Sequence, residues 1–334
     1  MDMTEQLANY LRAQMPAARD VVVTELERKS GGASRETWAF TAHWAENGHA
    51  VSREFILRRD PTRSLLESDR AREFRVLQAL YDSGIPVPRM YWLELEGKWL
   101  ERPFFIMEKL PGQAPVGTFP AGYPPAMQAR VAEQFVDILA RIHTLDWRAH
   151  AFDFLGVPAL GTDSARNQVG HWHRIYLQEC IEPHPILEEA FIWLSAHLPV
   201  ADRITLVHGD YRSGNYLFTD DGTVTAMLDW EMVHLGDPME DLGWACMKFW
   251  SGRGLVVGLT TRDDFLTRYT RASGIAVDAA RVFFYEMLGT VKMAVIALTG
   301  VRTFCDGKTH EASMPLVGFL VPRLLRDLTE QLEL

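Results

Sequence analysis

The sequence predicts an α+β protein of two lobes, in which an antiparallel β lobe is followed by a helical lobe. Strand-like runs concentrate in the first hundred residues, and helical apolar patterns dominate after residue 126. A segment rich in proline and glycine, residues 110–125, separates the two patterns. We therefore expect an N-terminal lobe over 1–108, a hinge and linker over 109–125, and a C-terminal lobe over 126–334.

The N-terminal lobe is predicted to consist of strands around one helix. Apolar residues at helical spacing predict a helix over 66–81, which Ser83 and Gly84 end. Pro86 and Pro88 then favour an extended segment. The expected strands cover residues 36–44, 54–59, 90–95 and 103–107.

The C-terminal lobe is predicted to be mainly helical, with three short strands. Helical apolar patterns cover residues 126–143, 168–178, 185–197, 239–250, 278–298 and 316–332. The strand-like runs are 204–207, 216–219 and 224–228.

Composition and charge restrict the class of partner. The 334 residues are 47% hydrophobic and 23% charged, which is typical of globular proteins. The net charge of −10 argues against nucleic acid, whose binding requires a basic face. A cationic substrate would suit this charge, although many soluble enzymes are acidic.

The cysteines and the apolar segments indicate a soluble cytoplasmic protein. Cys180, Cys246 and Cys305 are widely spaced and form no C-x-x-C pair, which favours a reducing compartment. The first residues include acids and no apolar core of a secretory signal. The apolar stretch 287–301 contains Lys292 and is too short to span a bilayer. We expect no membrane partner, and the oligomeric state stays open.

One segment carries most of the chemical information: residues 207–231, VHGDYRSGNYLFTDDGTVTAMLDWE. Asp210 and Asn215 share a loop between two predicted strands, and Asp229 follows a third strand. In such a set, Asp210 could hold an accepting hydroxyl, while Asn215 and Asp229 offer oxygen ligands to Mg²⁺. Phosphoryl-transfer enzymes need this combination.

A purely structural interpretation is available for each of these residues. Asp210 and Asn215 could simply cap turns, as Asp and Asn often do. His208, two residues before Asp210, is expected to order the loop by hydrogen bonding more than to act as a base.

These motifs resemble the catalytic and metal-binding loops of the aminoglycoside phosphotransferase family, relatives of the eukaryotic protein kinases. The resemblance rests on the spacing from Asp210 to Asn215, on Asp229 before Trp230-Glu231, and on the downstream run 235–242, LGDPMEDL. It implies a bilobal protein-kinase-like fold. It also implies that Asp241 braces the catalytic loop by hydrogen bonding to its backbone.

For Asp237, within the same downstream run, the resemblance leaves two roles open. It could belong to the family's continuation of the catalytic loop. It could equally cap a helix over 239–250, ahead of Pro238 at the first helical position.

The same resemblance assigns nucleotide-binding residues to the N-terminal lobe. Gly31, Gly32 and Ser34 lie in a turn of small residues whose backbone N–H groups could approach phosphate, although such a turn also suits a plain hairpin. Arg58 stands at the position of the phosphate-binding lysine of kinases, and Glu73 matches its helical partner. Arginine and lysine are not interchangeable, so the phosphate geometry stays open. Glu73 could otherwise be a solvated i,i+4 partner of charged neighbours.

The remaining nucleotide contacts follow from the same family pattern. Residues 104–108, FFIME, resemble the hinge strand, whose backbone would bond adenine near Glu108 to Leu110. The side chains do not distinguish ATP from GTP. Arg212 matches the protein-kinase lysine that meets the γ-phosphate, and we count it with Asp210 and His208 as catalytic.

The order of further motifs is most similar to one subgroup of this family. GGASRETW, FILRRDP, PFFIMEKLPG and HWHRIYLQEC resemble the phosphotransferase-like domain that occurs alone in bacteria and fused to acyl-CoA dehydrogenases elsewhere. The resemblance covers about residues 27–250. It implies ATP- and Mg²⁺-dependent phosphorylation of a small-molecule hydroxyl, for example of a hydroxyacyl-CoA.

Two other functions stay open at this point. A nucleotide-binding pseudokinase or regulatory module would agree with Arg58 in place of lysine. An aminoglycoside or macrolide antibiotic kinase would agree with the acidic charge.

The acceptor site is the least defined part of the sequence. His173 or Arg174 could meet an anionic group, and Glu179 or Glu182 a cation. However, the aromatic residues of 170–176 fall at i, i+3 and i+4, which is typical of a core face.

Overall fold

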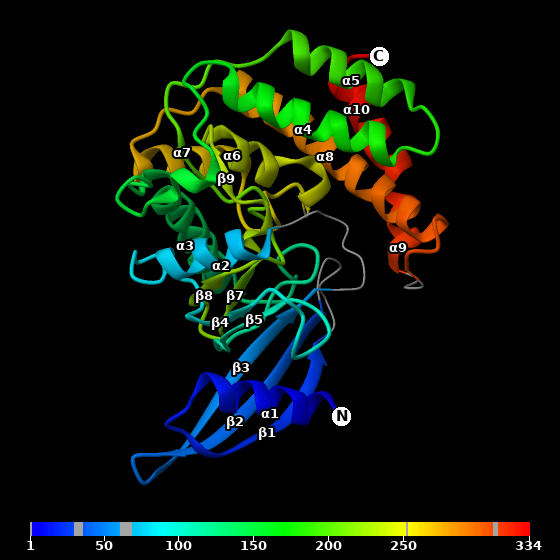
Figure 1. The fold of residues 1–334 in the computed structure, drawn as a ribbon. Coiled ribbons are helices and arrows are strands. Elements are labelled where there is room, and N and C mark those ends of the chain that lie inside the picture. The colour runs from blue at the N-terminus through cyan, green and yellow to red at the C-terminus, as the bar shows by residue number, and fades with distance from the viewer. Residues whose placement is uncertain (1, 30–35, 61–68, 252, 310–312) are drawn as a thin grey trace. The chain divides into compact units, whose positions relative to one another are not determined.

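A computed structural model describes residues 2–29, 36–60, 69–251, 253–309 and 313–334. The chain forms two compact units (Figure 1). Unit 1 comprises Met1–Tyr81 and Pro88–Leu110, and unit 2 comprises Asp82–Val87 and Pro111–Leu334. We describe each unit by itself.

Unit 1 is built on a five-stranded antiparallel sheet with the strand order β1-β2-β3-β5-β4. The strands are β1 (Arg19–Lys29), β2 (Glu36–Glu46), β3 (His49–Arg59), β4 (Met90–Glu94) and β5 (Phe104–Glu108). Strand β2 pairs with β1 on one side and with β3 on the other, and β5 inserts between β3 and β4. This register sets Arg58 of β3 opposite Phe105 of β5, inside the sheet.

Two helices accompany this sheet, so the expectation of a single helix in this region is wrong. The unpredicted helix α1 (Met3–Gln14) buries Leu7, Tyr10 and Leu11 and packs along β1 (Figure 1). The ring centroids of Tyr10 and Phe104 lie 4.8 Å apart. A short helix with one narrow apolar stripe gains its stability from such packing, because local propensity alone is marginal at this length.

The predicted helix of unit 1 is α2 (Arg70–Leu80), and residues 66–68 of the expected range lie outside the described residues. Asp69 caps it, since its side chain accepts from the backbone N–H of Arg72 at 3.1 Å. The helix buries Phe74 and Leu77 together with the carboxylate of Glu73. This burial makes Glu73 part of the interior of unit 1.

Unit 2 is mainly helical, as the sequence predicts. Its helices are α3 (Pro125–Thr144), α4 (Asp163–Glu179), α5 (Pro185–Ala196), α6 (Met239–Cys246), α7 (Arg262–Ser273), α8 (Ala279–Cys305), α9 (Ser313–Leu316) and α10 (Val321–Gln331), with 3₁₀ turns at Phe152–Leu155, Trp230–Met232, Lys248–Trp250 and Val317–Leu320. The helix expected over 239–250 divides into α6 and the 3₁₀ turn Lys248–Trp250. Helix α7 was not predicted, because it buries only Phe265 and Tyr269.

Two small antiparallel sheets in unit 2 hold the polar segment 207–231. Strand β6 (Thr205–Val207) pairs with β9 (His234–Gly236), and β7 (Tyr216–Phe218) pairs with β8 (Val224–Met227). Strand β9 was not predicted, because three residues carry no detectable pattern. Its pairing with β6 nevertheless places the start of the segment beside its end.

Residues 111–124 belong to unit 2 and contact the small sheet formed by β7 and β8. Gln113 forms an isolated antiparallel bridge with Phe218 of β7. The hydroxyl of Thr225 donates to the carbonyl of Pro111 at 2.6 Å. Gly112 has a φ of +118°, and a Cβ there would lie 2.9 Å from the carbonyl oxygen of Phe218. Only glycine fits this approach without a shift of the backbone.

Helix α8 is the central helix of unit 2. It packs against α4, α6 and α10, and it runs alongside α4 in Figure 1. It is also the one helix among the described residues with the length and composition of a membrane span, and 78% of its most apolar window is buried inside the fold. Helix α8 is longer than the apolar stretch 287–301 noted in the sequence. Its burial makes it a core helix.

We predict that Gly243→Ala destabilises unit 2 by about 1–3 kcal/mol, because overpacked interiors force neighbouring atoms to shift. A Cβ at Gly243 of α6 would lie 2.6 Å from the Cβ of Tyr285 of α8 and 2.8 Å from the backbone nitrogen of Glu286. Chemical denaturation of wild type and variant measures the difference.

Gly170→Ala is the matched control, because Gly170 also lies inside a helix and its added Cβ would meet no atom closer than 3.8 Å. We expect this variant to be at least as stable as wild type, since alanine favours a helix over glycine by about 0.5–1 kcal/mol. Equal stability of the Gly243 and Gly170 variants would contradict the close packing of α6 on α8.

Candidate active site

The residues of segment 207–231 that were predicted to carry chemistry lie on connected backbone in unit 2. Asp210 and Asn215 occupy the loop between β6 and β7, and both are buried. The backbone N–H of Leu228 donates to the carbonyl of Asn215 at 2.8 Å. This bond places Asp229, the next residue, beside the end of the loop. The structure therefore brings these residues into one region of unit 2.

The carboxylate of Asp210 is fixed by three side-chain donors. Its Oδ1 accepts from Nε of Arg212 and from Nε1 of Trp244, both at 2.9 Å, and its Oδ2 accepts from Nδ2 of Asn215 at 2.6 Å. Hydrogen bonds from charged and neutral donors on both oxygens leave little rotational freedom to the group. The arrangement can present a carboxylate in one orientation to a hydrogen-bond donor.

Arg212 is anchored as well as paired. Its guanidinium carbon lies 4.6 Å from the centroid of the Trp250 ring, and Nη1 donates to the carbonyl of Ser213 at 2.8 Å. The ring face and the carboxylate of Asp210 together stabilise the cation. The structure therefore places Arg212 as a direct neighbour of Asp210.

Asp229 has an unusual backbone conformation. Its φ of 64° and ψ of 59° are left-handed, which Asp tolerates better than most non-glycine residues. It immediately precedes the 3₁₀ turn Trp230–Met232. The left-handed residue turns the chain sharply between strand β8 and this turn.

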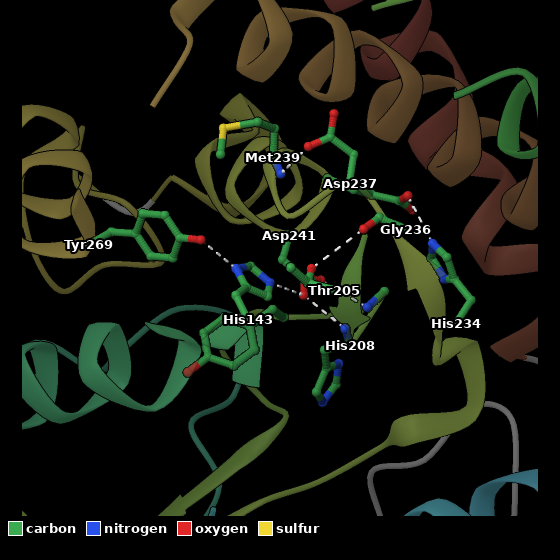
Figure 2. A network of polar contacts seen from close by, with 12 residues as sticks. His143, Thr205, His208, His234, Gly236, Asp237, Met239, Asp241 and Tyr269 are labelled. Atoms are coloured by element: carbon green, nitrogen blue, oxygen red, sulfur yellow. Dashed lines mark hydrogen bonds and ion pairs between the residues drawn. The ribbon is translucent and has the colours of Figure 1, made fainter. Parts of the chain in front are cut away.

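Asp241, at the start of α6, braces the loop as the family resemblance implied. Its Oδ2 accepts from the backbone N–H of His208 and its Oδ1 from that of Gly209, both at 2.8 Å. Nε2 of His143 lies 3.0 Å from the same carboxylate, and the hydroxyl of Tyr269 lies 2.7 Å from Nδ1 (Figure 2). The Asp241 side chain is completely buried.

The charge of Asp241 is stabilised despite this burial. Burial by itself favours the neutral acid, but the hydrogen bond and charge of His143, with the backbone N–H of His208, outweigh it. The pKa of Asp241 therefore lies below its usual value.

His208 connects two stretches of main chain. Its Nδ1 accepts from the backbone N–H of Asp210 at 3.2 Å, and its Nε2 donates to the carbonyl of Leu228 at 3.0 Å. Burial lowers the pKa of the ring, which suits a neutral imidazole with one donor and one acceptor nitrogen. These contacts agree with the loop-ordering interpretation of His208.

Asp237 combines the expected capping contact with an ion pair. Its Oδ1 accepts from the backbone N–H of Met239 at 3.0 Å (Figure 2), and Arg281 of α8 donates to both carboxylate oxygens at 2.6 and 3.1 Å. The residue therefore fixes the start of α6 against α8.

Several residues of this network carried no sequence signal. The helical patterns around His143 and Trp244 mark them only as core residues, and Lys292 lies in a long, mainly apolar helix. Trp244 follows Asp241 by three residues, which places both near one helix face, and this was the only available hint.

Unit 1 contains the predicted pairing of a cation with a helical acid. Nη1 of Arg58 lies 2.9 Å from Oε1 of Glu73, and Glu73 is 1% exposed. The interpretation of Glu73 as a solvated i,i+4 partner is therefore wrong. Arg70 adds a bond from Nη1 to the carbonyl of Arg58 at 3.0 Å, which fixes the backbone of the strand.

The structure describes some of the other residues predicted to bind the nucleotide. Gly31, Gly32 and Ser34 lie outside the described residues. Glu108 ends strand β5, and its backbone N–H already donates to the carbonyl of Arg89 at 2.8 Å. Leu110 is the last residue of unit 1.

The predicted acceptor residues on α4 separate into core and surface. Trp172 and Tyr176 are buried, in agreement with the core interpretation, whereas Arg174 is exposed. The ring of His173 packs on Phe191 of α5, with centroids 4.6 Å apart. Glu182 is exposed, and Glu179 is partly buried.

We predict that Asp241→Asn lowers the free energy of unfolding at pH 7 by about 1–3 kcal/mol, because the amide presents a donor to one of two buried N–H groups. The folded-state pKa of Asp241 is depressed, so its contribution is complete above the unfolded pKa of about 4 and is lost as the pH falls further. The difference from wild type should therefore shrink in acid.

Denaturant unfolding of both proteins between pH 7 and pH 3 measures this effect. The exposed Asp82→Asn variant is the control and should match wild type throughout. A stability difference for Asp241→Asn that stays constant with pH would contradict the ionised brace.

A family model for the phosphotransferase enzyme family matches residues 25–283. Two relatives found by sequence are mouse acyl-CoA dehydrogenase family member 10 and rat acyl-CoA dehydrogenase family member 11. The first is 33% identical over 221 residues, covering 65% of this chain and 20% of the relative. The second is 28% identical over 261 residues, covering 74% of this chain and 33% of the relative. The chain thus spans about a fifth to a third of the length of these relatives.

Solved structures agree on the fold. A protein from Ralstonia eutropha JMP134, assigned as an aminoglycoside phosphotransferase, superimposes with a TM-score of 0.74 at 25% identity over 98% of this chain and 97% of its own. The GDP complex of aminoglycoside 2'-phosphotransferase-IIIa gives a TM-score of 0.63 at 16% identity, with 98% of each chain covered. A ternary complex of aminoglycoside phosphotransferase APH(4)-Ia with AMP-PNP and hygromycin B gives 0.59 at 16% identity, covering 96% of this chain and 98% of its own.

These findings confirm the fold class and the resemblance drawn from the motifs. The antiparallel sheet of unit 1 and the helices of unit 2 are the two parts of a protein-kinase-like fold. The chain belongs to the phosphotransferase enzyme family.

Proposed function

We propose that the protein transfers the γ-phosphoryl group of ATP to a hydroxyl group of a small molecule, with Mg²⁺ as cofactor. The observation that carries this proposal is the carboxylate of Asp210, held by Arg212, Trp244 and Asn215 in one orientation. A fixed carboxylate is what in-line phosphoryl transfer requires of the protein, because positioning supplies most of the catalysis.

The proposed step conserves atoms and charge. The hydroxyl oxygen of the acceptor forms a bond to the γ-phosphorus while the bond from phosphorus to the bridging oxygen of ADP breaks. Asp210 accepts the hydrogen bond of this hydroxyl and takes its proton late in a loose transition state. Oδ2 is better placed than Oδ1 to accept this proton. One side-chain donor, Asn215, bonds Oδ2, whereas Arg212 and Trp244 both bond Oδ1.

The donor set of unit 2 fits Mg²⁺. Nδ2 of Asn215 donates to both the carbonyl and the carboxylate of Asp210, so the oxygen end of the amide is turned away from them. Among the described residues, no three His, Cys, Asp or Glu side chains form a metal site by themselves. Mg²⁺ in kinases is bound by one or two protein oxygen ligands together with substrate phosphates, and Asn215 and Asp229 match this number. The ion would neutralise charge on the phosphates.

Arg58 is the proposed ligand of the nucleotide phosphates. Its pairing with the buried Glu73 and the bond from Arg70 to its carbonyl hold it rigidly. Arginine can bind phosphate oxygens bidentately, so the charge of the missing lysine is retained with a different geometry. Fold relatives in complex with AMP-PNP and with GDP keep both ATP and GTP as candidate donors.

The proposed acceptor is the hydroxyl of a hydroxyacyl-CoA or a related metabolite. The support is the 28–33% identity to acyl-CoA dehydrogenase family members. One structural relative is an aminoglycoside phosphotransferase in complex with hygromycin B, and another is a macrolide 2'-phosphotransferase, so aminoglycosides and macrolides are the other acceptor classes to test.

We predict that Asp210→Ala lowers ATP-dependent phosphorylation by at least about 10²-fold, because the group that accepts the hydroxyl proton is lost. A kinase screen over hydroxyacyl-CoAs, hydroxylated metabolites, aminoglycosides and macrolides first identifies the acceptor. The variant is then assayed with that acceptor, and its melting temperature is measured in parallel.

Asp220→Ala, in the exposed turn between β7 and β8, is the control and should keep wild-type turnover. Retained turnover in a folded Asp210→Ala variant would exclude the proposed role. Nucleotide binding by wild type with no phosphorylated product in any panel would favour a pseudokinase instead.

We predict that ATP raises the melting temperature of the protein more with Mg²⁺ than without it, since a ligand that binds only the folded state stabilises it. At a ligand concentration 100 times Kd the gain is about 2.7 kcal/mol. Asp229→Asn should remove most of the additional rise in melting temperature that Mg²⁺ causes. It should leave the rise that ATP causes without Mg²⁺ unchanged. A Mg²⁺ effect of equal size in this variant would contradict the assignment of Asp229.

A further inference from the structure

Lys292, in the middle of helix α8, is a buried charge. The residue is 2% exposed and lies in a helix whose inward face is otherwise mainly apolar. Lysine is almost never buried unless it is paired. Replacement of a buried ion pair by apolar groups of similar volume often leaves stability unchanged or improves it. A charge at this position therefore needs a reason other than stability.

The polar contacts of Lys292 lead to the catalytic loop. Its Nζ donates to the carbonyl of Gly209 at 3.0 Å, which is the peptide bond that joins Gly209 to Asp210. Gly209 has a φ of +81°, and a Cβ there would lie 2.5 Å from the carbonyl oxygen of Met232. The carbonyl of Gly209 is thus held in a crowded, left-handed turn that admits little adjustment.

Lys292 also contacts the Asp210 carboxylate indirectly, through the indole ring of Trp244. Nζ lies 4.6 Å from the centroid of Trp244, and Nε1 of that indole donates to Oδ1 of Asp210 at 2.9 Å. A cation over the ring face draws electron density from the indole, which makes its N–H a stronger donor. The ring of Trp172 lies on another side of the ammonium group, at 5.5 Å.

The charged neighbours of Lys292 come from three elements. Glu240 of α6 lies 3.5 Å from Nζ through Oε1, and its Oε2 lies 3.0 Å from Nε2 of His234 in β9. His171 of α4 interacts with Lys292 electrostatically. The pKa of Glu240 is lowered although burial opposes this, because His234 and Lys292 stabilise the carboxylate. The bond to the carbonyl of Gly209 is shorter than the distance to Glu240.

The geometry points to Lys292 as a positioning residue that orients the Asp210 carboxylate through the Gly209 carbonyl and the Trp244 indole. This inference rests on the proposed function of Asp210. Lys292 itself touches neither the nucleotide nor the acceptor in this scheme. Its contribution is to fix the peptide bond before Asp210 and the donor on Oδ1.

Two variants separate positioning from stability. Lys292→Met keeps the length of the side chain but leaves the buried Glu240 with His234 as its remaining partner, so it should lower the melting temperature by about 5 °C or more. Lys292→Met combined with Glu240→Gln removes both charges and keeps a group that can bond His234, so most of that stability should return. Thr299→Val is the matched control, because the Thr299 hydroxyl donates to the carbonyl of Val295 within the same helix.

The kinetic test uses ATP hydrolysis, with water as the acceptor, and phosphorylation of any acceptor found. We expect kcat of the double variant to fall about 10- to 100-fold with little change in the KM for ATP, since a misplacement of about 1 Å costs about 10²-fold. Thr299→Val should keep wild-type kcat. A double variant with wild-type kcat, or with the whole loss in the KM for ATP, would overturn the inference.

A spectroscopic test decides the same point without enzymatic activity. The ten tryptophans are labelled with ¹⁵N at the indole nitrogen, and the Trp244 signal is assigned by its loss in Trp244→Phe. Asp210→Ala marks the position of this signal when the indole has lost its carboxylate acceptor. In the double variant we expect the signal to move at least half of the way to that position. A signal that stays at the wild-type position would overturn the inference, whereas inactivity of the wild type would affect only the proposed function.

Discussion

The candidate active site depends on one buried carboxylate, that of Asp241. Two consecutive backbone N–H groups, those of His208 and Gly209, donate to this carboxylate. A buried N–H without an acceptor costs as much as a lost hydrogen bond, so the brace and the loop conformation require each other. His143 keeps the brace ionised, and Tyr269 orients His143, so the chain of contacts extends from α7 through α3 and α6 to the loop.

The Asp210 carboxylate is surrounded by groups that limit its movement rather than by groups that stabilise the fold efficiently. Arg212 lies against Trp250, and Trp244 carries a cation on its face, so two donors of the carboxylate are themselves fixed by aromatic contacts. Ion pairs of this kind contribute little net stability. In the proposed reaction these groups would orient the carboxylate, which phosphoryl transfer needs more than it needs covalent chemistry.

The fold could be predicted from the sequence wherever an element has a long pattern of its own. Helices α3 and α5 agree with their predicted ranges within one residue, because each carries several turns of apolar periodicity. Helices α1 and α7 were missed because many polar residues interrupt their apolar patterns. Strand β1 was missed because it buries only Val21 and Val23, and β9 because it has only three residues. Such elements are stabilised by the surface that they pack on, and that surface is formed by distant parts of the chain.

The sequence alone determined the family and the fold class, and it singled out the loop residues Asp210, Asn215 and Asp229, because their local spacing matches the pattern of phosphoryl-transfer enzymes. It also indicated the pairing of Arg58 with Glu73, which the structure contains at 2.9 Å. Only the tertiary structure decided what holds the carboxylate of Asp210. Trp244 and Lys292 lie 34 and 83 residues beyond the groups they contact, in helices whose patterns predict only burial. A hydrogen bond or a cation over a ring depends on distances of a few ångströms, and these follow from the packing of α6 on α8 rather than from spacing along the chain.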